Sequence, residues 1–277
     1  MRTGRYLKGR TQRQSTELSF LQLAAGMARW GDRILTALLS ILLLVILAYA
    51  SFALWDTWRI YDSAGIDEEL LRYKPQLNLV EEGDGFAELL QINPEVCAWL
   101  TVEDTHIDYP VVQGEDNAKY VNTDVYGEFS LSGSIFLDYR NAGDFTDSYS
   151  LLYGHHMEGG VMFGELAQFL KQDYFDEHPT GTLLLPNRAC RIEIFACLET
   201  DAYDTQVFYP GNLSEGELNQ FLERIKEDSA QYREIGVSSQ DRVIALSTCS
   251  DTSTNARTVV FGRLIEISNM EGGAMGE

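Results

Sequence analysis

An uninterrupted apolar run near the N-terminus restricts this chain more than any other feature. Residues 34–55 (ILTALLSILLLVILAYASFALW) contain no charged side chain. As a helix rising about 1.5 Å per residue, the run would be about 33 Å long, which is enough to cross a bilayer. A cleaved signal peptide is the competing interpretation, but its apolar core is usually only about 7–15 residues long. We therefore expect an uncleaved transmembrane anchor at 34–55.

The charges on the two sides of this run predict its orientation. Residues 1–33 carry seven Lys and Arg against two acidic residues, about +5, whereas the rest carries 14 basic and 40 acidic residues, about −26. Because basic flanks stay in the cytoplasm, we expect residues 1–33 to be a cytoplasmic basic segment in the cell and the remainder to lie outside. The acidic remainder also argues against nucleic acid as a partner, since phosphate binding needs a basic patch.

The part beyond the anchor is predicted to be mainly β (α+β). Residues 56–92 contain helical pieces at 66–73 and 86–91 and are expected to form a stalk. Residues 93–268 form the predicted globular domain, and the Gly-rich tail 269–277 is expected to be disordered. We predict eight strands, at 98–102, 106–112, 134–138, 150–153, 182–185, 191–197, 243–248 and 258–267. Eight short strands suit a closed β-barrel, because closure removes exposed edges.

Two amphipathic segments interrupt the strands and are expected to be peripheral helices packed on the barrel. The first covers 163–171, and the second begins with a capping box made by Ser214 and Glu217. The second lies in a connection of more than forty residues between Cys197 and Asp241. A long insertion beside an active site is often a wall of the substrate groove.

Three of the four cysteines are predicted to be buried structural thiols. Cys190 and Cys197 are seven residues apart in one expected strand, so we expect their side chains to point to opposite faces and not to bridge. Cys97 lies in another apolar run. Because the chain has no CxxC and no metal-type Cys/His spacing, we expect no metal site and no thioredoxin motif.

The fourth cysteine ends an apolar strand in the stretch 241–267. A polar, turn-forming loop follows Cys249, and Arg257 then opens a second β-branched run. A hairpin would bring Arg257 back beside Cys249, where a cation favours the thiolate form. From these residues alone, a reactive thiol and a buried structural thiol remain equally good interpretations.

A nucleophilic cysteine also needs a proton partner, and two adjacent histidines close another apolar run. His155 and His156 follow Gly154 at the end of the predicted strand 150–153. Strand alternation puts them on opposite faces and does not choose between them. Cysteine and histidine at two strand ends, with an arginine near the first, fit a thiol-transferase site.

Several spaced motifs resemble those of the sortases, and specifically of class B sortases. They are NPEVCAWLTVEDTHIDYPVVQGEDNAKYVN at 93–122, GSIFLDYRN at 133–141, YGHHM at 153–157 and LSTC at 246–249 followed by Arg257. Several motifs in this order are a far more specific signal than a Thr-x-Cys alone. The resemblance implies a sortase-type barrel that carries a membrane-anchored cysteine transpeptidase without a cofactor.

The resemblance also implies roles for individual residues. Cys249 would be the nucleophile, His155 the acid, because the family's histidine directly follows the glycine, and Arg257 the oxyanion ligand. The seven-residue gap before Arg257 is short for the class, which leaves Arg263 as a second candidate. Asp251 would either orient His155 or cap the turn. The implied contacts of the sorting signal are Asn117, Val121 (where leucine is expected), Tyr203, Ser247 and Thr248.

The implied activity is cleavage of a C-terminal sorting signal in secreted proteins through a cysteine thioacyl intermediate. The acyl group would pass to an amine of the cell wall, from a peptidoglycan precursor, or to a pilin lysine. A thiol protease that hydrolyses the same intermediate is the first alternative, and a non-catalytic surface β-domain is the second.

Overall fold

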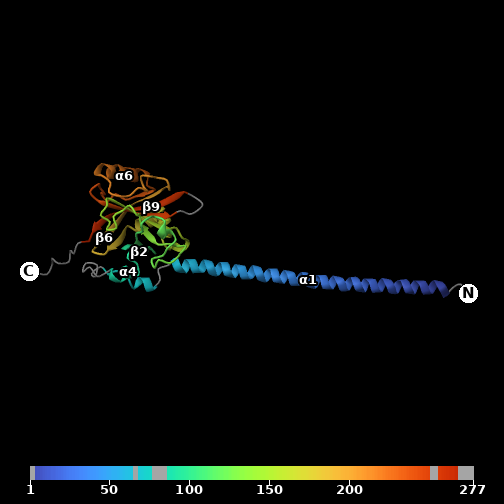
Figure 1. Ribbon diagram of the computed structural model, residues 1–277. Helices are drawn as coiled ribbons and strands as arrows, with labels where there is room; N and C mark the ends of the chain where they lie inside the picture. The colour runs from blue at the N-terminus through green and yellow to red at the C-terminus, as the bar shows by residue number, and fades with distance from the viewer. Residues whose placement is uncertain (1–3, 65–67, 77–85, 250–254, 268–277) are drawn as a thin grey trace, which may run out of the picture. The chain divides into compact units, whose positions relative to one another are not determined.

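A computed structural model describes residues 4–64, 68–76, 86–249 and 255–267, with the main chain alone at Cys249. The chain divides into two units, residues 1–58 and 59–277, which are described separately. The first is dominated by helix α1 (Gly4–Ala64; Figure 1). Within it, Ala25–Trp58 contains an 18-residue window with a mean hydropathy of 2.6 and is long and apolar enough to cross a membrane. This segment includes residues 34–55, the run in which the anchor is expected.

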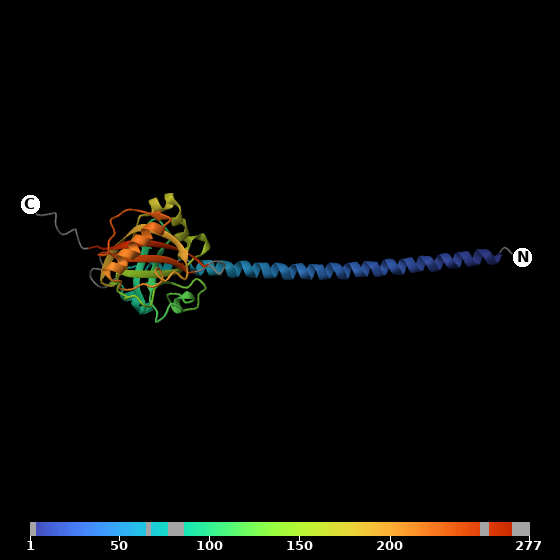
Figure 2. The ribbon, with the colours of Figure 1, turned by 90° about the horizontal axis from the view of Figure 1, so that it is seen from above.

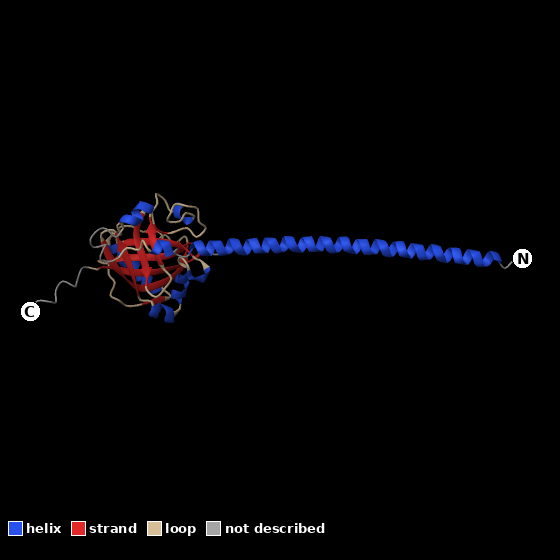
Figure 3. Ribbon diagram, turned by 90° about the horizontal axis from the view of Figure 1, so that it is seen from below, coloured by secondary structure: helices blue, strands red, loops and turns tan. Residues whose placement is uncertain are grey.

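The second unit is built on a closed barrel, as expected (Figure 3). Its strands pair in the order β5-β1-β2-β3-β4-β8-β9-β6, and β5 pairs with β6 to close the ring. The strands are β1 (Val96–Val102), β2 (Asp108–Val112), β3 (Ile135–Leu137), β4 (Tyr149–His155), β5 (Thr180–Leu185), β6 (Arg188–Asp201), β8 (Arg242–Cys249) and β9 (Ala256–Glu266). All eight predicted strands are confirmed. A two-residue strand that was not predicted, β7 (Gln231–Tyr232), pairs antiparallel with β6 at Ala196 and Cys197.

Apolar side chains fill the barrel and cover it on two sides. One cluster fills the interior. A second lies between the barrel and helix α6 (Glu215–Asp228), which crosses the strands in Figure 2 and begins with the predicted capping box. A third includes Leu70 and packs helix α4 (Ala87–Ile92) on β1 and β2. The described pieces of the predicted stalk, with α2 (Glu68–Leu71), thus include residues packed on the barrel.

Shorter helices occupy the connections between the strands. Two are 3-10 helices, η1 (Lys119–Val121) and η2 (Glu158–Gly160). The amphipathic segment expected at 163–171 is also a 3-10 helix, η3 (Gly164–Leu170), and α5 (Gln172–Glu177) follows it. Leu166 and Phe169 of η3 are buried in the interior cluster. The prediction of a packed amphipathic segment is therefore confirmed, although its hydrogen-bond pattern differs.

The expectation that Cys190 and Cys197 point to opposite faces is wrong. The β6–β9 ladder shifts register between Ile194 and Ala196, which inserts a bulge into β6. A bulge adds one residue to the alternation, so positions seven apart return to the same face. Both cysteines consequently lie in the interior cluster, and both are free thiols.

Candidate active site

Two parallel strands bring the predicted histidine and cysteine together at one end of the barrel. β4 and β8 are paired from Tyr149↔Val243 through to His155↔Cys249. Both strands end at this last pair, so the main chain of each residue lies where the sheet gives way to loops. Neighbouring strands are about 4.8 Å apart, which keeps the two positions close. The structure therefore places His155 beside Cys249, although they are far apart in sequence.

The antiparallel strand β9 brings Arg257 to the same end. The last rung of the β8–β9 ladder pairs Ser247 with Val259. Continued for two more residues, the same register sets Cys249 opposite Arg257. Between these two positions, the Thr258 N–H donates to the Thr248 Oγ1 at 3.4 Å. The Nη1 of Arg257 is buried and has no hydrogen-bond partner among the described residues. Because a buried guanidinium donor without an acceptor is costly, this atom is suited to bind an anionic oxygen.

The imidazole of His155 is held by the main chain of another loop. Its Nε2 lies 2.8 Å from the Val121 carbonyl oxygen, in η1. A carbonyl oxygen only accepts, so we assign the hydrogen to Nε2, which leaves Nδ1 for the chemistry. His156 is exposed, and its main chain bridges Met162.

A glycine that sequence reasoning missed supports this carbonyl. Gly133 has a φ of +57°, and a Cβ built on it would lie 2.4 Å from the carbonyl oxygens of both Tyr120 and Val121. Only glycine can occupy such a conformation so close to another main chain. The one sequence signal was its place at the start of the GSIFLDYRN motif.

The remaining predicted site residues lie in different surroundings. Ser247 and Thr248 are buried in β8, next to Cys249, whereas Tyr203 is 79% exposed in the connection between β6 and α6. The Asn117 Nδ2 donates to Asp138 at 2.8 Å. Asp251 lies outside the described residues. The roles of these residues in substrate binding stay predictions.

Arg263, the alternative to Arg257, is placed at the opposite end of its strand. It pairs with Val243, the second residue of β8, and its Nη2 lies 2.5 Å from a carboxylate oxygen of Glu193. Six residues of extended strand separate Arg263 from Arg257, about 20 Å. This distance and its own ion pair argue for Arg257 as the arginine of the site.

The other cysteines are poor nucleophiles. Burial raises the pKa of Cys97 to about 12, and its thiol donates to the Val111 carbonyl. Burial also raises the pKa of Cys197 to about 12, and it raises the pKa of Cys190 above its usual value. Since the thiolate is the reactive form, these three thiols are inert near neutral pH.

Comparison with known proteins identifies the family of this chain. Residues 100–265 match the family model described as "Sortase domain". Sortase B of Listeria monocytogenes is 36% identical over 190 residues, which cover 67% of this chain and 76% of the relative. Sortase B of Staphylococcus aureus is 29% identical over 83% of this chain and 97% of its own.

Solved structures give the same result. A Streptococcus pyogenes class B sortase involved in pilus biogenesis is 50% identical, with a TM-score of 0.61, and the match covers 66% of this chain and 100% of that one. The S. aureus sortase B–substrate complex is 30% identical, with a TM-score of 0.63, over 66% of this chain and 86% of that one. The chain therefore belongs to the sortase family, as a class B sortase, and is a cysteine transpeptidase that acts on sorting-signal substrates.

Proposed function

We propose that Cys249, His155 and Arg257 carry out the sortase reaction in this chain. The observation that carries the proposal is the last rung of the β4–β8 ladder, which pairs His155 with Cys249. The buried, unpartnered Nη1 of Arg257 supports it from the neighbouring strand. Nucleophile, proton donor and oxyanion ligand are the three groups that acyl transfer requires.

The chemistry divides into two acyl transfers. The Cys249 thiolate attacks a peptide carbonyl of the sorting signal, and the negative charge on the carbonyl oxygen is stabilised by the Arg257 guanidinium. The protonated Nδ1 of His155 gives its proton to the leaving amine, so the peptide bond breaks and a thioester remains. An incoming amine then attacks the thioester and loses a proton to His155, and the cysteine leaves as thiolate.

The partners and the cellular arrangement follow from the same proposal. The acyl donors are secreted proteins with a C-terminal sorting signal, and the acceptor is a peptidoglycan-precursor amine or a pilin lysine. The S. pyogenes relative involved in pilus biogenesis supports the lysine.

Helix α1 anchors the protein in the cell membrane as a single span, with a cytoplasmic N-terminus and an extracellular catalytic domain. Ala25–Trp58, long and apolar enough to span, supports this topology.

The test uses the full-length chain in detergent micelles and a randomised peptide library read by mass spectrometry. Wild type is expected to cleave a subset of peptides and, with triglycine or a lysine peptide added, to form the ligated product. Cys249→Ala is expected to lose all turnover and keep its thermal unfolding midpoint. Turnover retained in this variant rules out the mechanism. Hydrolysis alone, unchanged by either amine, would instead favour the thiol protease.

A further inference from the structure

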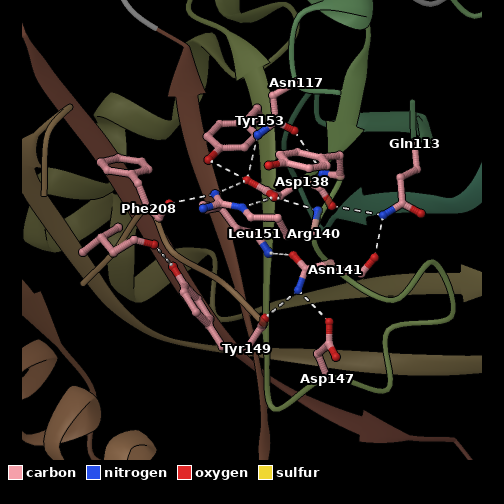
Figure 4. A network of polar contacts seen from close by, with 12 residues as sticks. Gln113, Asn117, Asp138, Arg140, Asn141, Asp147, Tyr149, Leu151, Tyr153 and Phe208 are labelled. Atoms are coloured by element: carbon pink, nitrogen blue, oxygen red, sulfur yellow. Dashed lines mark hydrogen bonds and ion pairs between the residues drawn. The ribbon is translucent and has the colours of Figure 1, made fainter. Parts of the chain in front are cut away.

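A fully buried carboxylate directly after β3 is the centre of a polar network beside the proposed site (Figure 4). The Asp138 Oδ1 accepts from the Nε of Arg140 at 2.8 Å, and its Oδ2 accepts from the Arg140 Nη2 at 2.7 Å. The same Oδ2 accepts from Asn117 at 2.8 Å and from the Tyr153 hydroxyl at 3.1 Å. Burial alone would raise the pKa of Asp138, but the bonds from Arg140 outweigh it and lower the pKa. Asp138 is therefore an anion at neutral pH, and its acceptor positions are filled.

Two of these bonds reach the elements that hold His155. Asn117 lies just before η1 in the chain. The last residue of η1, Val121, supplies the carbonyl oxygen that binds the imidazole of His155. Asn117 is fixed at both ends, because its Oδ1 also accepts from the Tyr139 N–H at 3.0 Å. Tyr153 lies two residues before His155 in β4, so the two side chains share a face.

Arg140 extends the network to the long connection between β6 and α6. Its Nη2 donates to the Phe208 carbonyl oxygen at 2.8 Å. The guanidinium carbon lies 4.9 Å from the Tyr209 ring centroid and 5.7 Å from that of Tyr139, and both rings are largely exposed. The Phe208 ring stacks on Tyr153, with centroids 6.4 Å apart. This connection also carries Tyr203, a predicted substrate contact.

We propose that the Asp138–Arg140 pair is a positioning hub that sets the spacing of three walls of the acyl-donor groove. The walls are the loop from Asn117 to Val121, the end of β4, and the connection around Phe208. The inference rests on the proposed site and assigns a task to residues that do not touch the reacting atoms. A charged pair with directional bonds specifies one arrangement of these three walls, which apolar packing would leave less defined.

The experiment compares Arg140→Met with wild type in the full-length chain in micelles. The probes are the two library peptides that wild type cleaves best. Because Arg140 bonds Asp138 and the Phe208 carbonyl but takes no part in the contact of His155 with Val121, we expect the KM to rise about tenfold, the kcat to change less than threefold, and discrimination between the two peptides to fall. Arg140→Lys keeps the charge but loses the forked geometry and should give an intermediate KM.

Arg263→Met is the matched control, since it removes a partly buried arginine–carboxylate pair at the far end of β9. It should leave the KM and the discrimination unchanged. The rate at which iodoacetamide labels Cys249 should be the same in all variants.

If Arg140→Met does not fold, Tyr153→Phe removes a single bond of the hub and should raise the KM severalfold. A KM and discrimination equal to wild type in the folded variants, or the same rise in Arg263→Met, overturn the hub. Failure of wild type to cleave any peptide counts against the proposed function instead.

Discussion

The Nε2 of His155 and the carbonyl oxygen of Val121 lie 2.8 Å apart, and this contact fixes which nitrogen of the imidazole is free for proton transfer. The carbonyl belongs to η1, which comes from a different part of the chain than the strand that carries the histidine. The orientation of the proposed acid therefore depends on a loop with no reactive group of its own.

Gly133→Ala is expected to disturb this contact. Its Cβ would overlap the carbonyl oxygens of Tyr120 and Val121, so η1 must shift relative to residue 133, which disturbs the contact of the Val121 carbonyl with His155. We expect the kcat for peptide cleavage to fall at least tenfold and the domain to lose about 1–3 kcal/mol of stability. Steady-state kinetics, thermal unfolding and the nitrogen NMR shifts of the imidazole would measure these effects. Gly127→Ala is the control, because Gly127 also has a positive φ but nothing lies within 4 Å of its Cβ position. An equal fall in kcat in both variants would show that the η1 contact is irrelevant.

Arg257→Met is expected to lower kcat/KM for peptide cleavage by about 10²–10³, the usual effect of losing one oxyanion donor. The reason is that its Nη1 is already buried and has no acceptor in the described part of the chain. Arg257→Lys should recover part of the rate, since it restores the charge without the planar donor. The acylation rate, measured by mass spectrometry in single turnover, checks the prediction. A rate within threefold of wild type in Arg257→Met would remove this residue from the mechanism.

Iodoacetamide at pH 7 is expected to label Cys249 and to spare the other three cysteines. With a pKa of about 12, fewer than about one in 10⁴ molecules of Cys97 or Cys197 carries a thiolate at that pH. Peptide mapping by mass spectrometry locates the label, and all four cysteines should react in denaturant. An unlabelled Cys249 in the folded protein would favour a structural thiol and the non-catalytic alternative.

Acid is expected to weaken the attachment of the β6–α6 connection. Burial would raise the pKa of Asp204, but hydrogen bonds from Arg224 and Thr200 lower it to about 2. A lowered pKa stabilises the fold above the unfolded value near 4, and this contribution is lost as the pH falls towards 2. After allowance for solvent screening, it amounts to about 1–2 kcal/mol.

The stability difference between wild type and Arg224→Met should consequently be largest above pH 5 and shrink between pH 4 and 2. Urea unfolding at a series of pH values measures it. Lys226→Met is the control, because its partner Glu234 is exposed and the pair contributes little. A difference that does not change with pH would mean that Asp204 is not held as an anion by Arg224.

The strands could be predicted because their residues alternate and are bounded by polar turns. The sequence pattern could not show the bulge at Ile194 and Ala196, because it depends on how β6 pairs with β9. The bulge places Cys190 and Cys197 on the same face, where simple alternation assigns them to opposite faces. β7 was missed because two residues carry no periodicity.

The site could be predicted only in part, for a related reason. Cys249, Arg257 and the adjacent histidines 155 and 156 are reactive residue types at expected strand ends, so they stand out as candidates in the chain, but only the resemblance chooses His155 over His156. Gly133 and Asp138 act through contacts with distant main-chain and side-chain groups, and no local pattern encodes those partners. Their presence in a motif shared with a family was the only signal.

The pairing of β4 with β8 also has a consequence for how the enzyme becomes active. The two strands are neighbours although about ninety residues separate His155 from Cys249, and joining them requires a large loop to close. Contacts between such distant segments tend to form slowly. A newly made or partly folded chain thus carries its thiol without an acid beside it. Under the proposed mechanism, acyl transfer therefore begins only once the barrel has closed and the two strands are paired.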